Sequence, residues 1–363
     1  MQKKTNLVER LREMIRSGEL YPGQKLKNGI ELARDFGVAH LTMRRVLREL
    51  ELSGDITIIH GKGMFVSRNP IKKRKFLVVR SGVANNGDPG HYILPHFLKR
   101  CSELEIEVDE ADLVFLRHSP VAGTVRQLRD NQYTGILLAC NHFTGTEPEL
   151  QIFSKLNVPV LIPRGESTDA GITGFGVLRS DLRKAWEDGI KYLKSCGMRK
   201  VGLILSDENK GQLIRGFSTA EHFELLKKYD FGSDENLVHI ISKAQKADLK
   251  HSVGQILEKL MELDEPPEAV FCYSDYVALF VYLAAQKMNL KIPEDISVMG
   301  FSGYPGGKML SPPLATVDCD YAAAGIMAAE LLCDPDKWHW KPAAERDFII
   351  PHKLKKRASV AVK

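Results

Sequence analysis

The sequence of 363 residues lacks the features that mark exported, membrane-spanning and disulfide-stabilised proteins. No uninterrupted apolar run approaches the roughly 18 residues that a membrane-spanning helix needs. The polar start Met-Gln-Lys-Lys-Thr-Asn is not followed by the apolar core of a signal peptide. The 6 cysteines form no CxxC pair and no Cys/His spacing typical of zinc ligands. We therefore expect a cytoplasmic protein with free thiols and no bound metal.

Motifs of the common enzyme classes are also missing. The chain has no HExxH, no Walker phosphate loop, no Gly-x-Ser-x-Gly elbow and no Cys/His dyad. A sugar-modifying enzyme would need a pair of acid/base side chains, for which the sequence offers no candidate. The sequence thus predicts no catalytic residues, no cofactor and no enzymatic activity.

Charge is distributed unevenly along a composition typical of globular proteins, with 44% hydrophobic and 27% charged residues. The length suits about two to three domains. Residues 1–75 contain 17 Lys and Arg against 8 Asp and Glu, whereas the remainder contains 34 against 38. A small basic head on a mildly acidic body indicates a polyanion-binding module joined to a second function. A basic surface kept for solubility is the alternative.

The basic head reads as a winged helix-turn-helix. Apolar spacing predicts helices over 5–17, 30–36 and 40–53, followed by short strands over 56–59 and 64–66. The third helix has Arg44, Arg45 and Arg48 on one face, and the hairpin tip is His-Gly-Lys-Gly. Such a helix can lie in a major groove, where Arg reads guanine, while the tip approaches phosphate or the minor groove. An ordinary solvated helix surface is the alternative.

The head resembles the GntR family of bacterial transcription regulators. The matching segments are 15–26 (IRSGELYPGQKL), 31–33 (ELA), 36–38 (FGV), 42–47 (TMRRVL) and 61–66 (GKGMFV). The resemblance implies that Thr42 and Arg44 act from the recognition helix and that His60 and Gly61 act from the wing. Together with the pattern of basic side chains, it gives these candidate DNA-binding residues: His40, Thr42, Arg44, Arg45, Arg48, His60, Gly61 and Lys62.

Three positions depart from the family pattern. Ala39 and His40 replace the usual Ser/Thr-Arg at the start of the recognition helix, and Ile30 stands where an Arg is often found. Losing the hydroxyl cap costs the helix about 1 kcal/mol. We therefore expect DNA binding, but to an operator other than the family's common one.

From residue 76 onward, short apolar runs alternate with helical stretches, as in doubly wound parallel sheets. Two series of four strands predict two lobes whose ligand sites lie at the carboxyl ends of the strands. The expected organisation is a winged helix-turn-helix over 1–68, a linker over 69–75 and a two-lobed effector-binding and dimerisation domain over 76–363. The predicted strands are 76–79, 113–116, 135–140, 158–162, 201–205, 237–241, 269–273 and 296–301.

The body resembles the effector domain of the LacI/GalR repressors, which shares its α/β fold with periplasmic binding proteins. Segments 292–301 (IPEDISVMGF), 312–317 (PPLATV) and 197–201 (GMRKV) carry the resemblance. A GntR-type head on this body looks like the arabinose-repressor class. The resemblance implies a sugar or sugar derivative as effector.

Several positions that hold the sugar in that family differ in this chain. Leu213 replaces an Arg, Ser302 replaces the Asp of Gly-Phe-Asp, and Ser274 replaces the Asn of an Asn-Asp pair. Each candidate could instead have a purely structural role. Asp275 could only cap a helix, Tyr92 could belong to the core and Arg164 could pair with Asp181. The candidate ligand-binding residues are Tyr92, Asn141, Arg164, Ser274, Asp275 and Ser302.

The sequence therefore predicts a ligand-responsive transcription regulator, a repressor that binds double-stranded operator DNA as a homodimer and senses a small molecule. The alternative is a cytoplasmic solute-binding or sensor protein whose basic head binds another protein. The sequence leaves open the effector, the operator, whether the effector releases or promotes DNA binding, and whether the regulator represses or activates.

Overall fold

The structure is a computed structural model that describes residues 2–67, 74–80, 89–140, 143–166, 168–206, 218–232 and 234–363. The chain divides into two compact units. Unit 1 comprises Met1–Asn85, Ile93–Arg179 and Ala322–Phe348 and contains the head and the first sheet. Unit 2 comprises Asn86–Tyr92, Ser180–Tyr321 and Ile349–Lys363 and contains the second sheet. The division into head, linker and body therefore stays a prediction.

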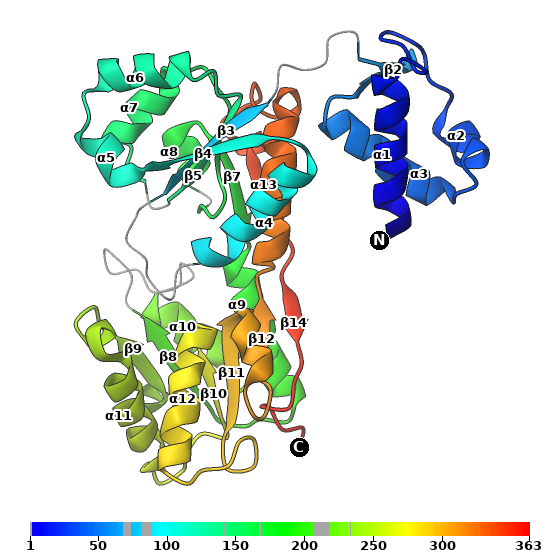
Figure 1. Cartoon of the computed structure of the whole chain (residues 1–363). Helices are drawn as coiled ribbons and strands as arrows, with labels where there is room; N and C mark the ends of the chain where they lie inside the picture. The colour runs from blue at the N-terminus through cyan, green and yellow to red at the C-terminus, as the bar shows by residue number, and fades with distance from the viewer. Residues whose placement is uncertain are drawn as a thin grey trace. The chain divides into compact units, whose positions relative to one another are not determined.

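The head has the predicted order of three helices and a hairpin (Figure 1). Leu11, Met43 and Val46 are among the buried side chains that form its core. β1 and β2 pair antiparallel, and a bridge from Lys25 to Phe65 adds a third segment to the wing. The elements are α1 Gln2–Arg16, α2 Gly29–Asp35, α3 His40–Leu52, β1 Ile56–Ile59 and β2 Gly63–Val66.

The first six-stranded sheet has the order β13-β7-β6-β5-β3-β4, and the pairings from β4 to β7 are parallel. Its strands are β3 Lys75–Arg80, β4 Glu107–Asp112, β5 Gly135–Ala139, β6 Val160–Ile162, β7 Gly176–Ser180 and β13 Asp347–Ile350. The α-helices of unit 1 outside the head are α4 Gly90–Glu103, α5 Leu113–His118, α6 Val121–Asp130, α7 Pro148–Ser154, α8 Asp169–Thr173 and α13 Tyr321–Cys333.

Helices cover both faces of this sheet (Figure 1). Leu77 and Val79 of β3 pack in a cluster with apolar side chains of α5, α6 and α7. Phe76, which points to the other face, has its ring centroid 6.3 Å from that of Phe97 on α4. Helix α13 packs closely on α4, because a Cβ added to Gly325 would lie 2.3 Å from the carbonyl oxygen of Ile93.

One predicted strand is wrong. Residues 113–116 lie in α5, and the strand is the preceding acidic segment, β4. Leu113 and Leu116 are buried while Val114 and Phe115 are exposed, which is helical rather than alternating periodicity. The side chain of Asp112 caps the helix by accepting a hydrogen bond from the backbone N–H of Val114 at 2.6 Å.

The acidic strand β4 lies at the sheet edge, where two cations of β3 form ion pairs with its carboxylates. The Nζ of Lys75 lies 2.8 Å from Oδ2 of Asp109, and Nη2 of Arg80 lies 2.8 Å from Oε2 of Glu110. A charged sequence can thus form a strand where its neighbour supplies the opposite charges.

Unit 2 repeats the architecture with a sheet in the order β14-β12-β11-β10-β8-β9, parallel except for β14. Phe271 and Phe301 face the cluster that contains α9 and α10, whereas Val270 and Val298 face α11 and α12. The elements are α9 Leu182–Ser195, β8 Val201–Ser206, α10 Thr219–Lys228, β9 Val238–Ile241, α11 Leu249–Met261, β10 Ala269–Cys272, α12 Asp275–Lys287, β11 Ser297–Ser302, β12 Ala315–Asp318 and β14 Lys353–Lys355.

Within the described ranges, none of the helices combines the length and apolar character needed to cross a bilayer. The same residues contain no group of three or more His, Cys, Asp or Glu side chains arranged to hold a metal ion. All six cysteines are free thiols.

Candidate functional site

The third helix of the head presents an exposed cationic face. Met43, Val46 and Leu50 of α3 are buried, which leaves Arg44 and Arg45 pointing to solvent. Neither guanidinium forms an ion pair or hydrogen bond with any described residue. Arg48 lies on the same face, with its Nη1 4.0 Å from Oε2 of Glu51. His40 is also exposed and Thr42 is half-buried, and both lie in the first turn of the helix.

The start of α3 is uncapped, as the sequence predicts. Ala39 occupies the N-cap position and makes no side-chain hydrogen bond to the helix. The neighbouring α2 has a complete capping box, in which the side chain of Asn28 accepts from the N–H of Glu31 and the Glu31 carboxylate accepts from the N–H of Asn28. The first turn of α3 therefore leaves backbone N–H groups available to an external acceptor.

The wing, which follows this helix in the sequence, has a basic tip. His60, Gly61 and Lys62 are exposed in the turn between β1 and β2. Gly61 adopts φ 73° and Gly63 adopts φ 115°, which L side chains rarely tolerate. A Cβ on Gly63 would also lie 2.9 Å from Cε of Lys25, which brings a second lysine stem to the wing.

A buried ion pair ties α3 to the helices of the first sheet. Nη1 and Nη2 of Arg100 donate to the two carboxylate oxygens of Glu49 at 2.6 and 3.0 Å, and Nη2 also donates to Glu330 at 2.8 Å. Burial lowers the pKa of Arg100, but hydrogen bonds and charges from Glu49 and Glu330 outweigh it and hold the pKa above its usual value. The recognition helix is thus linked electrostatically to α4 and α13.

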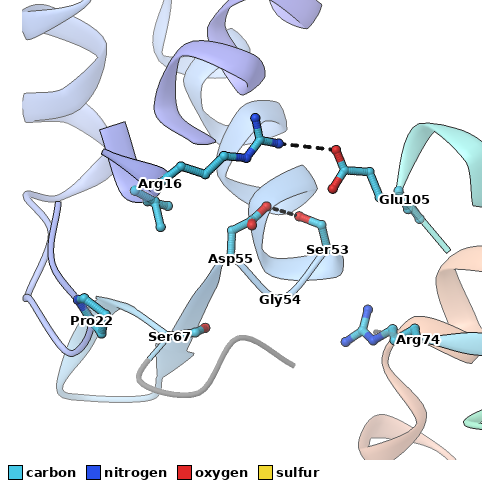
Figure 2. A pocket seen from close by; sticks show the side chains of 10 residues that line it. Arg16, Pro22, Ser53, Gly54, Asp55, Ser67, Arg74 and Glu105 are labelled. Carbon is cyan, nitrogen blue, oxygen red and sulfur yellow. Dashed lines mark hydrogen bonds and ion pairs between the residues drawn. The ribbon is translucent and has the colours of Figure 1, made fainter. Parts of the chain in front are cut away.

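A cavity of about 450 Å³ adjoins this contact (Figure 2). Its charged lining is satisfied locally, because Nη2 of Arg16 donates to Glu105 at 3.4 Å and the Ser53 hydroxyl donates to Asp55 at 2.5 Å. Arg74 donates to the carbonyl oxygen of Leu52. These polar groups already have hydrogen-bond partners within the protein, so we assign no ligand to this cavity.

In unit 1, Arg164 lies where the fold class places ligands. It follows β6 directly, at the carboxyl end of the parallel strands, and is half-buried. Its guanidinium makes no ion pair or hydrogen bond with any described residue of unit 1. Asn141 falls outside the described residues, as does Leu213.

In unit 2, Ser274 and Asp275 follow the carboxyl end of β10, but the protein itself occupies their polar atoms. Ser274 is the N-cap of α12 and accepts a hydrogen bond from the N–H of Val277 at 3.2 Å. Asp275 is buried, and its two oxygens accept from the Thr316 hydroxyl at 2.5 Å and the Tyr304 N–H at 2.6 Å. Burial raises the pKa of Asp275 to about 7, although these two hydrogen bonds act to lower it.

An aromatic stack lies beside this network. Tyr92 is half-buried, and its ring centroid lies 4.5 Å from that of Tyr304 with an angle of 23° between the planes. Tyr321 lies 6.1 Å from Tyr304 by the same measure. Ser302, at the end of β11, adopts φ 107°, a strained conformation for a residue with a side chain. The sequence pattern missed Tyr304, although its position just beyond a predicted strand could have marked it.

Comparison with known proteins accounts for both parts of the chain. Residues 3–66 match the family described as bacterial regulatory proteins, gntR family, and residues 190–360 match the periplasmic binding protein-like domain. The chain joins a GntR-type DNA-binding domain to a periplasmic binding protein-like domain. An arabinose metabolism transcriptional repressor of Geobacillus stearothermophilus is 23% identical over 334 residues, which cover 90% of this chain and 89% of the relative. The chain is accordingly a transcription regulator and not an enzyme.

Solved structures support the same fold for the body of the regulator. A LacI-family regulator of Enterococcus faecium with bound ribose superposes with a TM-score of 0.58, at 18% identity, over 80% of this chain and 100% of that one. The lac repressor dimer bound to operator and an anti-inducer gives a TM-score of 0.60, at 16% identity, over 80% of this chain and 95% of that one. The predicted α/β class with its doubly wound parallel sheets is confirmed.

Proposed function

We propose that the regulator is a repressor that binds a two-fold operator as a homodimer and responds to a sugar or sugar derivative in the cytoplasm. The observation that carries the proposal is the exposed pair Arg44 and Arg45 on α3, directly followed by a basic wing. Unpaired arginines on a helix with its opposite face buried are suited to the major groove. The lac repressor dimer on its operator, which shares the fold of the body, favours the two-fold arrangement.

We assign the DNA contacts to the residues that the sequence selects. Arg44, Arg45, Arg48, His40 and Thr42 would act from α3, and the tip residues His60, Gly61 and Lys62 from the wing. The uncapped N–H groups after Ala39 offer further contacts to a phosphate. The proposed domains remain 1–68 for the head, 69–75 for the linker and 76–363 for the effector-binding and dimerisation domain.

We assign effector binding to the carboxyl ends of the parallel strands, considered separately in each unit. In unit 1 the free guanidinium of Arg164 can donate paired hydrogen bonds to sugar hydroxyls or to an anionic group. In unit 2 the exposed part of Tyr92 can contact the apolar face of a sugar ring, and Ser302 supplies a hydroxyl. Asp275 would act indirectly, by fixing the loop that carries Tyr304, and Ser274 by capping α12.

Selection of preferred sequences from random duplexes by the full-length protein tests the function. We expect enrichment of a motif with two-fold symmetry whose affinity falls steeply with salt concentration. If no duplex is enriched, with or without candidate sugars, the head does not bind specific DNA and the regulator binds another partner.

A gel-shift titration on the selected duplex tests the recognition helix. Arg44→Ala should weaken binding by about 1–3 kcal/mol if the side chain reads a base. Arg126→Ala, which removes an exposed arginine of α6, is the matched control and should bind as the wild type does. Equal affinity of both variants would remove α3 from the interface.

A further inference from the structure

Two large aliphatic side chains are exposed at the helix-turn-helix without packing on its core. Ile30 of α2 is 61% exposed and Leu41 of α3 is 59% exposed. Neither belongs to the apolar cluster of the head, whereas Met43 and Val46 of the same helix are completely buried. The core of the head is therefore complete without these two side chains.

Both side chains lie at the same end of the motif. Leu41 shares a helical face with Arg44, Arg45 and Arg48, three, four and seven residues further on. Ile30 follows Gly29, whose added Cβ would lie 3.7 Å from Nε2 of His40. The first turns of α2 and α3 are thus neighbours. In helix-turn-helix proteins, the first turns of the recognition helix are the part that reaches base edges.

The side chains around Leu41 indicate which kind of partner this surface binds. Exposed arginines that lack partners among the described residues flank Leu41, so the surface that meets this helix has to be anionic and also carry apolar groups. Duplex DNA has both, because phosphates line the groove and the C5 methyl of thymine is the apolar group that a base pair presents in the major groove.

We propose that Leu41 and Ile30 read thymine methyl groups, so that the operator has thymine at the positions they contact. This inference rests on the proposed function of the head and adds the specificity of its apolar contacts. Arg44 and Arg45 supply the polar contacts of the same face. The departure at Ile30 from the family pattern then replaces a polar contact with an apolar one.

Replacing thymine by deoxyuridine removes only the methyl group and tests the proposal directly. In the duplex selected by the full-length protein, each thymine is replaced in turn and binding is measured by titration. We expect at least one position where deoxyuridine weakens wild-type binding by about fourfold, the effect of one buried methyl. Leu41→Ala should bind the two duplexes equally at that position, and Ile30→Ala should do so at a different position.

Two controls separate methyl recognition from a general loss of affinity. Arg44→Ala should bind more weakly to both duplexes yet keep the fourfold preference for thymine. Leu283→Ala, at a partly exposed leucine of α12, should change neither affinity nor preference. Because Leu41 and Ile30 lie outside the core, both variants should keep the wild-type circular dichroism spectrum.

The outcomes distinguish this inference from the proposed function. If a duplex is selected with steep salt dependence but deoxyuridine has no effect anywhere, only the methyl reading is overturned. The same holds if Leu41→Ala and Ile30→Ala keep the full thymine preference. If no duplex is selected, both proposals fail, and the apolar and basic surface of α3 serves a protein partner.

Discussion

At the scale of single residues, burial decides what a side chain can do. Asp275 is a carboxylate at the carboxyl end of a parallel strand, the edge where doubly wound sheets bind ligands. In the structure its oxygens instead receive hydrogen bonds from Thr316 and Tyr304, so it positions the loop after β11. Arg164, at the corresponding edge of the other sheet, has no such partner among the described residues and keeps its hydrogen-bonding capacity for a ligand.

The titration of Asp275 gives a prediction about stability. Burial raises its pKa to about 7 from an ordinary value of 3.8. Between these pH values the folded chain holds a proton that the unfolded chain has lost, so its stabilising contribution is complete below pH 3.8 and declines until pH 7. Within this range the free energy of unfolding should fall by up to about 1 kcal/mol per pH unit.

Urea unfolding at several pH values checks this prediction. Asp275→Asn keeps one donor and one acceptor but does not titrate, so the difference from wild type should depend on pH only within that window. Asp130→Asn, at an exposed position of α6, is the control. A parallel pH dependence for wild type and Asp275→Asn would show that the carboxylate is not the titrating group.

Arg164→Met is the corresponding prediction for effector binding. The variant removes the free guanidinium but keeps an apolar stem of similar length. An effector found by thermal-shift screening of sugars and sugar phosphates should bind at least tenfold more weakly, since a hydrogen bond to a charged group contributes about 1.5–3 kcal/mol. Operator affinity without effector should not change. Unaltered effector affinity by calorimetry would place the site elsewhere.

At the scale of elements, helix packing depends on individual glycines. Gly325 lets α13 approach α4, whereas Gly254 of α11 has no atom within 4 Å of an added Cβ. Gly325→Ala should therefore destabilise the chain by about 1–3 kcal/mol through overpacking. Gly254→Ala should stabilise it by about 0.5–1 kcal/mol because alanine restricts the unfolded chain. Chemical denaturation should give a lower free energy of unfolding for Gly325→Ala and a higher one for Gly254→Ala. Changes of the same sign in both variants would contradict the close contact at Gly325.

The elements also show where prediction of secondary structure from the sequence pattern succeeds. The head follows its predicted helices and strands closely because its apolar spacing, its glycines and its turn residues all act within a few residues of one another. Helix α5 was predicted as a strand because a four-residue apolar run fits either structure. The choice depends on Asp112 as a cap and on cations from β3, and the latter come from a distant part of the sequence.

At the scale of the molecule, charge separates the DNA-binding part from the rest. Residues 1–75 contain 17 basic and 8 acidic side chains, whereas the remainder contains 34 and 38. The salt dependence of operator binding should therefore come from the head alone. Lys62→Ala should reduce the slope of log K against log salt by about 0.9 if its ammonium neutralises one phosphate. Lys243→Ala, at an exposed lysine of unit 2, should leave the slope unchanged.

The sequence by itself determined the modular plan, because the head motif, the uneven charge and the strand–helix alternation are local properties of the chain. It also located the cationic face of α3 and the strand ends that carry Arg164 and Ser302. Only the tertiary structure decided which polar groups are already satisfied, since Asp275 meets partners 29 and 41 residues away. Likewise, the exposure of Ile30 and Leu41 follows from which side chains fill the core, and spacing alone does not specify that choice.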